Sequence, residues 1–209
     1  MRLTKYSHAC VRLERDGAVL VIDPGTLSER AALDGADAVL VTHEHFDHLD
    51  VEALTEAREK RPDLRIYTHP EVTPKLGDLA GSVTEVQPGD DFEAAGFSVR
   101  TYGGLHAVIH SDIPRISNVG FFIEGVYHPG DSYDVPSDAE VQTLLLPLAA
   151  PWSKLAEAVE FVRQVAPART HPIHEGLLND VGLAVFDRMV GSLGGHGYAR
   201  LGAGEAVDL

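Results

Sequence analysis

The stretch from Thr42 to Asp50, Thr-His-Glu-His-Phe-Asp-His-Leu-Asp, constrains the fold more than any other part of this sequence. It follows the apolar run 38–41, which predicts a buried strand. It precedes residues 51–60, which predict an amphipathic helix with Asp50 as N-cap. Three histidines and an aspartate therefore lie in a strand-to-helix turn. Because α/β proteins usually place their sites at the carboxyl ends of strands, this turn predicts a functional site.

The spacing within the turn suits metal binding. Residues two apart on an extended segment point the same way, so His43 and His45 can converge on one ion. Asp47 and His48 lie just past the bend and can face a second ion. Zinc binds histidine nitrogen and carboxylate oxygen, and a catalytic zinc typically has about three protein ligands and one open position. The alternative is a solvated turn whose histidines are incidental.

Three motifs resemble one enzyme superfamily. His43-x-His45-x-Asp47-His48 resembles the signature of the metallo-beta-lactamase-fold hydrolases. Ser-His-Ala-Cys at 7–10 and Val-Ile-Asp-Pro-Gly at 21–25 resemble the branch that contains the ascorbate-6-phosphate lactonase. The resemblance runs from about Lys5 to His174 and implies an α/β (α+β) fold, a four-layer αββα sandwich. The strand-rich pattern with interspersed helices agrees with it.

The resemblance also implies the remaining metal ligands. His106, after a strand predicted over 97–102 and two glycines, matches the third histidine of the first metal better than His110 does. Asp131 lies in Gly-Asp-Ser, which resembles the family's Gly-Asp-Ser/Thr, where the aspartate bridges the metals. His174 matches the last ligand better than His171.

The implied centre thus contains two divalent ions. The first would bind His43, His45 and His106. The second would bind Asp47, His48 and His174. Asp131 and a water or hydroxide would bridge the two. Nitrogen-rich ligation favours zinc, although manganese, iron and nickel accept similar ligands.

Five further residues are candidates for supporting roles. The resemblance implies that Asp23 orients a metal ligand and that His8 lies near the mouth of the site. His110 could touch substrate or simply lie on a loop. Arg115 could grip a carboxylate or phosphate, with a solvated surface arginine as the alternative. Tyr133 could offer its phenol to a substrate.

The other expected elements frame these residues. Residues 3–13 and 18–22 predict two strands around an Asp-Gly turn. Ser153 is expected to cap a helix over 154–166, and Trp152 is expected to pack in the core rather than wall the pocket. The glycine-rich tail from Gly194 carries no recognisable chemistry.

Composition bounds the class of protein. A chain of 209 residues can form one well-cored domain, so a single domain over 1–209 is expected. The net charge of −15 makes nucleic acid an unsuitable partner.

The lone cysteine, Cys10, excludes an intrachain disulfide and is expected to be a buried apolar residue. No signal peptide is visible, and the longest apolar stretch, 144–152, is shorter than the ~20 residues of a membrane span. A cytoplasmic protein without membrane partners is expected, and its oligomeric state, homo-oligomer included, stays open.

These features predict a metal-dependent hydrolase that acts on a small molecule. Two ions would lower the pKa of a bridging water toward ~7 and stabilise the negative oxygen of the transition state. Asp47 could then accept the proton of the bridging hydroxide and pass it to the leaving group. The bond would be an ester, lactone, amide or phosphodiester, and the resemblance favours a lactone or phosphoester. The competing hypothesis is a non-catalytic protein that binds metal for structure or sensing.

Overall fold

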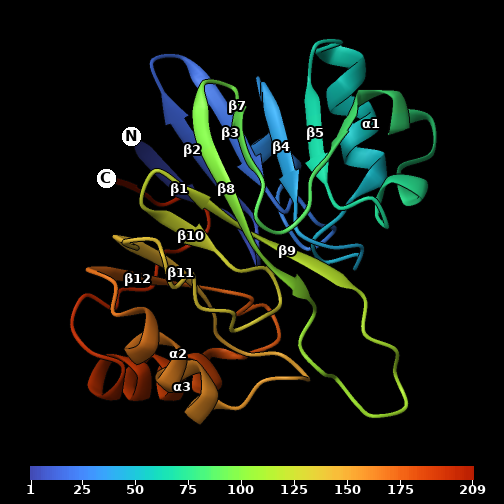
Figure 1. Cartoon of the computed structure of the whole chain (residues 1–209). Coiled ribbons are helices and arrows are strands. Elements are labelled where there is room, and N and C mark those ends of the chain that lie inside the picture. Colours follow the sequence, from blue (N-terminus) through green and yellow to red (C-terminus); the bar gives the residue numbers. More distant parts are fainter.

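Two β-sheets packed face to face form the centre of the molecule in a computed structural model that describes residues 1–209 (Figure 1). The first sheet has the order β13-β1-β2-β3-β4-β5-β6. Its strands are β1 (Arg2–Lys5), β2 (Val11–Arg15), β3 (Ala18–Ile22), β4 (Ala38–Val41), β5 (Arg65–Thr68), β6 (Val83–Glu85) and β13 (Ala206–Asp208). Strands β3 to β6 are parallel, whereas β13, β1, β2 and β3 pair antiparallel.

The second sheet has the order β12-β11-β10-β9-β8-β7. Its strands are β7 (Asp91–Ala94), β8 (Phe97–Leu105), β9 (Ser117–Ile123), β10 (Val126–His128), β11 (Thr143–Pro147) and β12 (Arg169–Ile173). Strands β7 to β10 pair antiparallel, and β10 to β12 are parallel. Both sheets are therefore mixed.

Helices cover the outer faces of both sheets (Figure 1). The first sheet carries η1 (Arg30–Leu33), α1 (Val51–Lys60) and η2 (Thr73–Ser82). The second sheet carries α2 (Leu155–Val165) and α3 (Asp180–Leu193). These layers confirm the expected αββα sandwich.

The alternation of side chains in β3 shows how the sequence builds these layers. Leu20 and Ile22 face the core between the two sheets. Val19 and Val21 face the core under the first sheet's helices. Because successive strand residues point to opposite faces, a strand that is apolar throughout must be covered on both sides.

Several predicted elements have the expected bounds, but the first predicted strand does not. Helix α1 spans 51–60, and the Asp50 side chain accepts a hydrogen bond from the Ala53 amide at 3.0 Å, as expected of its N-cap. The single strand predicted over 3–13 is wrong, because the chain turns back at residues 6–10 and β1 pairs with β2. His8 occupies the left-handed region in this turn, with φ of 58°. No glycine or proline marks the turn, so the sequence pattern concealed it.

The carboxy-terminal half differs from expectation at two places. Ser153 does not cap α2; its hydroxyl bonds instead to the Ala150 backbone, and Lys154 is the N-cap residue. The glycine-rich tail, for which no element is predicted, contains β13, which pairs with β1 at the opposite end of the chain. No helix of the structure combines the length and the apolar character that crossing a membrane requires.

Candidate metal centre

Loops that follow β1, β4, β8, β10 and β12 bring histidine and aspartate side chains together in two groups, whose ligand atoms lie within 4.8 Å of one another inside each group. The first group, cluster A, consists of His43, His45, His106 and Asp131. The second group, cluster B, consists of His8, Asp47, His48 and His174. All seven residues that the sequence predicts as ligands lie in these clusters, and His8 joins them.

In cluster A, nitrogens from two loops face a common point. His43 Nε2 lies 3.1 Å from His45 Nδ1, so the pair on the β4 loop converges as its spacing predicts. His106 Nε2 lies 3.2 Å from Asp131 Oδ2. The His106 ring centroid lies 5.0 Å from that of His43 and 4.8 Å from that of His45.

In cluster B, Asp47 Oδ2 is the common neighbour. It lies 3.0 Å from His8 Nε2, 3.4 Å from His174 Nε2 and 4.0 Å from His48 Nε2. His8 is only 2% exposed, so it lies deeper than the mouth position implied by the resemblance.

Asp131 joins the two clusters. Its Oδ2 lies 3.2 Å from His106 Nε2 in cluster A and 3.2 Å from His174 Nε2 in cluster B. Its Oδ1 lies 3.1 Å from His48 Nε2. One carboxylate therefore faces histidine nitrogens of both clusters, as a bridging ligand would.

A hydrogen-bond acceptor lies beside the Nδ1 atom of four of these histidines and places a proton on that nitrogen. His48 Nδ1 lies 2.6 Å from Asp23 Oδ2, His106 Nδ1 lies 2.6 Å from the Ala107 carbonyl, and His174 Nδ1 lies 2.8 Å from the Ala149 carbonyl. The Thr42 hydroxyl donates to Asp23, so it accepts from His43 Nδ1 at 2.9 Å. With Nδ1 held in this way, the Nε2 atoms point into the centre, the orientation that metal-bound histidines commonly have.

The unpaired atoms of the centre fit divalent metal ions. The Nε2 atoms of His48, His106 and His174 and the Oδ1 atom of Asp131 are buried without hydrogen-bond partners. Each such atom costs about 1–3 kcal/mol unless something binds it. Two ligands about 2.0–2.1 Å from a tetrahedral zinc ion lie roughly 3.3 Å apart. The separations of 3.1 to 3.4 Å in both clusters match that spacing.

Burial and neighbouring charges shift the pKa values of the histidines and carboxylates in the centre. Burial and the neighbouring His48 hold the pKa of His43 well below its usual value. Burial also lowers the pKa of His174, but the Asp131 and Asp47 carboxylates, 3.2 and 3.4 Å from its Nε2 atom, outweigh burial and raise that pKa to about 9. Burial by itself would raise the pKa of Asp131, yet His48 and the neighbouring His106 and His174 hold it well below the ordinary value. The carboxylates are therefore ionised at neutral pH and ready to bind cations.

Asp23, predicted to orient a ligand, lies fully buried behind the centre. Its Oδ1 accepts from the Thr42 amide at 2.8 Å, and its Oδ2 accepts from the Thr42 hydroxyl at 2.7 Å and from His48 Nδ1. It thus positions the β4 loop and one histidine of cluster B.

Two residues that sequence reasoning passed over hold the Gly130-Asp131 loop. Asn118 is buried, accepts from the Asp131 amide at 2.9 Å and donates to the Pro129 carbonyl at 2.9 Å. His128 Nδ1 accepts from the Gly130 amide, and its Nε2 donates to the Ala9 carbonyl at 2.9 Å. An asparagine at a strand start carries no local signal for such a contact.

Three other candidates lie outside the clusters. His110 is exposed on the loop 106–116. Arg115, also exposed, donates through Nε to the His106 carbonyl at 2.7 Å, which ties the base of that loop together. The Tyr133 hydroxyl donates to the Pro147 carbonyl at 3.1 Å, so it already has a structural partner. His171, the weaker alternative to His174, contacts the Ala199 carbonyl instead.

Trp152 differs from its expected role. It is half-buried rather than a core residue, and its indole Nε1 donates to Asp131 Oδ2 at 2.8 Å. The prediction of core packing is therefore wrong. Nothing in the sequence near Trp152 could indicate a partner that lies 21 positions away.

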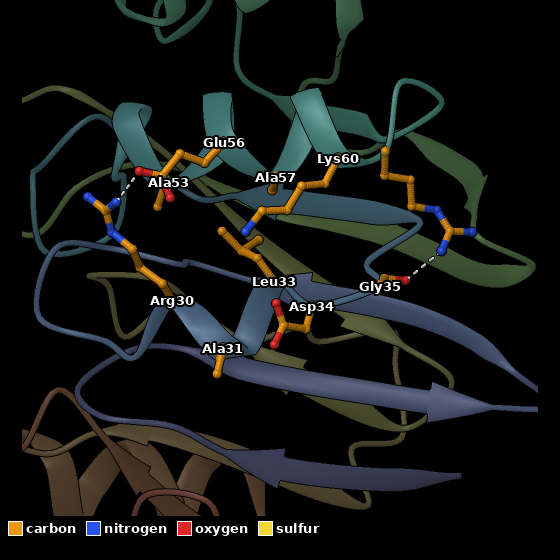
Figure 2. Close-up of a pocket in the computed structure, with 10 residues that line it drawn as sticks. Arg30, Ala31, Leu33, Asp34, Gly35, Ala53, Glu56, Ala57 and Lys60 are labelled. Carbon is orange, nitrogen blue, oxygen red and sulfur yellow. Dashed lines mark hydrogen bonds and ion pairs between the residues drawn. The ribbon is translucent and has the colours of Figure 1, made fainter.

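A separate groove of about 430 Å³ lies between η1 and α1 (Figure 2). Two of its charged side chains are paired: Arg30 pairs with Glu52 and Glu56, and Arg61 pairs with Asp37. It contains none of the predicted ligands.

Comparisons with known proteins show what the whole chain is similar to. A family model described as a beta-lactamase superfamily domain matches residues 2–174. Protein Rv0786c of Mycobacterium tuberculosis is 39% identical over 185 residues, which cover 85% of each chain. A UPF0173 metal-dependent hydrolase of Aeropyrum pernix is 27% identical over 206 residues, covering 84% of this chain and 82% of its own. A solved metallo hydrolase of Ignicoccus hospitalis has the same fold, with a TM-score of 0.77, 21% identity and coverage of 99% and 97%.

Proposed function

The chain belongs to the beta-lactamase superfamily and is a metal-dependent hydrolase, and from this premise we propose that it hydrolyses an ester or lactone bond of a small molecule at a two-metal centre. His43, His45 and His106 would hold one ion, and Asp47, His48 and His174 the other, with Asp131 between them. Zinc suits these ligands best, and manganese, iron and nickel remain alternatives.

The observation that carries this proposal is the position of Asp131. A carboxylate oxygen 3.2 Å from a histidine nitrogen of each cluster supports two adjacent ions rather than one. Ions held there would lower the pKa of a shared water and stabilise the negative oxygen that develops on the substrate.

The residues around Asp47 orient its carboxylate and keep it ionised. Asp47 Oδ2 lies 3.0 Å from His8 Nε2 and 3.4 Å from His174 Nε2, and these two histidines outweigh burial and hold the pKa of Asp47 well below the usual range. His8 can orient this carboxylate, because its backbone carbonyl is fixed by Lys5 Nζ at 2.8 Å and by the His174 amide at 3.1 Å. Asp47 would take the proton of the attacking water and pass it to the leaving group.

The surface near the centre supports an apolar substrate. Phe46 lies between two predicted ligands and is 65% exposed, while Val108 and Leu177, on two other ligand loops, are 55% and 58% exposed. Each of the three lies on a loop that also carries a predicted ligand, where an apolar side chain could contact a bound substrate. The one basic residue of the loop 106–116 is Arg115. These features favour an ester or lactone with an apolar group over a phosphodiester.

Metal analysis tests the centre. Protein purified without added metal is expected to contain close to two transition-metal ions per chain, and His43→Ala and Asp131→Ala are each expected to lower that content. His69→Ala is the matched control, because His69 lies on a loop outside both clusters. Absence of metal uptake after reconstitution with zinc, manganese or iron would refute the proposal and favour a non-catalytic role.

A substrate panel then tests the bond class. Lactones and aryl esters of increasing alkyl length are expected to be hydrolysed faster than phosphodiesters by the metal-loaded protein. Asp47→Asn alters both a proposed ligand of the second ion and the proposed proton acceptor, so it is expected to lower both the metal content and the rate. A protein that contains two metals but cleaves only phosphodiesters would contradict the proposed substrate class.

A further inference from the structure

Trp152 contacts both halves of the candidate metal centre. It is the only tryptophan of the chain and lies in the loop 148–154, which follows β11. Its indole Nε1 donates to Asp131 Oδ2 at 2.8 Å. Its ring centroid lies 6.0 Å from that of His106 in cluster A and 6.4 Å from that of His174 in cluster B. The indole therefore adjoins three predicted ligands at the point where the clusters meet.

The loop that carries Trp152 is itself firmly held. Its Leu148 amide donates to the Ile173 carbonyl at 2.9 Å, and its Ala149 carbonyl accepts from His174 Nδ1 at 2.8 Å. The Ser153 hydroxyl accepts from the Ala150 amide at 3.0 Å. One loop thus positions a ligand of cluster B through a backbone carbonyl and the shared carboxylate through an indole.

The chemistry of the indole explains why this contact matters. An indole N–H can only donate, so it requires an acceptor oxygen at Asp131 Oδ2 and holds the carboxylate in one rotation. That oxygen is the one that lies 3.2 Å from histidine nitrogens of both clusters. Partners behind the ligands of a metal site fix ligand orientation, and removing them typically lowers metal affinity by about 10–100-fold.

We propose that Trp152 is a positioning residue whose indole N–H fixes the Asp131 carboxylate between clusters A and B and so raises the affinity of the centre for its two metal ions. This inference rests on the proposed two-metal centre. It assigns a role to a residue that is not one of the predicted ligands and lies 21 positions from Asp131 along the chain.

Substitution of the indole tests the role of its N–H. Trp152→Phe is expected to lower zinc affinity about 10–100-fold in competition with a chelating dye. Because phenylalanine also changes the packing, the single tryptophan allows a sharper replacement: global incorporation of benzothienylalanine, which keeps the ring shape and has sulfur in place of the N–H. The same loss of zinc affinity is expected with this analogue.

Tyr133→Phe is the matched control. The Tyr133 ring lies 5.1 Å from that of Trp152, and its hydroxyl donates to the carbonyl of Pro147 at the end of β11, yet Tyr133 belongs to neither cluster. This variant is expected to keep wild-type zinc affinity. Urea unfolding of each metal-free protein checks that the variants remain folded.

Each outcome has one meaning. Loss of zinc affinity in both Trp152 proteins but not in Tyr133→Phe supports the role of the N–H. Wild-type affinity in the benzothienylalanine protein, or an equal loss in Tyr133→Phe, overturns it while leaving the two-metal centre intact. A wild-type protein that binds no zinc, manganese or iron refutes the proposed function and this inference together.

Discussion

Asp23→Asn should separate the fold of this protein from its metal binding. The buried Asp23 carboxylate accepts three hydrogen bonds, from the Thr42 amide, the Thr42 hydroxyl and His48 Nδ1. Asparagine has the same shape but one acceptor oxygen. If that oxygen stays on the Thr42 amide, the new NH₂ group faces His48 Nδ1 and donates to it. The His48 proton must then move to Nε2, the nitrogen that faces Asp131 at 3.1 Å.

The opposite orientation of the amide is less stable. It would place an NH₂ group against the Thr42 amide N–H, and a buried donor without an acceptor costs about 1–3 kcal/mol. We therefore expect the shifted proton on His48, which removes the lone pair that would bind metal. Loss of the hydrogen bond that orients a metal-binding side chain lowers the affinity for the metal about 10–100-fold, equivalent to roughly 1.4–2.8 kcal/mol of binding free energy.

Asp23→Ala provides the contrast in stability. It leaves three buried donors without acceptors, at about 1–3 kcal/mol each, which is a large part of a typical stability of about 5–15 kcal/mol. Zinc competition and urea unfolding of the metal-free proteins measure both effects. Asp23→Asn should fold but bind the second zinc weakly, whereas Asp23→Ala should be strongly destabilised. Wild-type affinity for both ions in Asp23→Asn, or equal destabilisation by the two substitutions, would refute the tautomer argument.

Three further predictions concern pH, a glycine and the cysteine. The pKa of His174 is about 9 in the folded protein, against 6.5 for a free imidazole, so its protonated ring stabilises the metal-free fold by roughly 3 kcal/mol. This stabilisation is fully present below pH 6.5 and is lost as the pH rises through 9. Zinc affinity should rise over the same pH range because zinc binds the neutral imidazole ring. Urea midpoints of the metal-free protein that increase toward pH 9 would contradict the predicted loss of stability. Gly130→Ala should lose stability and zinc affinity, because Gly130 has φ of 63° and an added Cβ would collide with Asn118 Oδ1. Gly17→Ala, with φ of 85° and open space around it, should lose only the ~1–2 kcal/mol of left-handed strain and keep its zinc affinity. Burial raises the pKa of the Cys10 thiol to about 12, so a thiol reagent at pH 8 should label it only after unfolding in urea, and rapid labelling of the native protein would show that the thiol is accessible.

Local patterns predicted much of the fold. The bounds of α1, the Asp50 cap and the alternation in β3 each depend on residues a few positions apart, which the chain brings together whatever its tertiary structure. The convergence of His43 and His45 has the same local origin. The turn at 6–10 and strand β13 escaped prediction because each depends on partners far along the chain.

By itself, the sequence determined the ligand-rich turn at 42–50, and its resemblance to one superfamily indicated His106, Asp131 and His174 as further ligands. Tertiary structure alone decided that His8 lies against Asp47, 39 positions away, and that the Trp152 indole holds Asp131. The physical reason is the reach of the interactions. Strand alternation and helix capping act over a few residues, whereas a buried polar side chain takes whichever partner the packing of the two sheets places within hydrogen-bond distance.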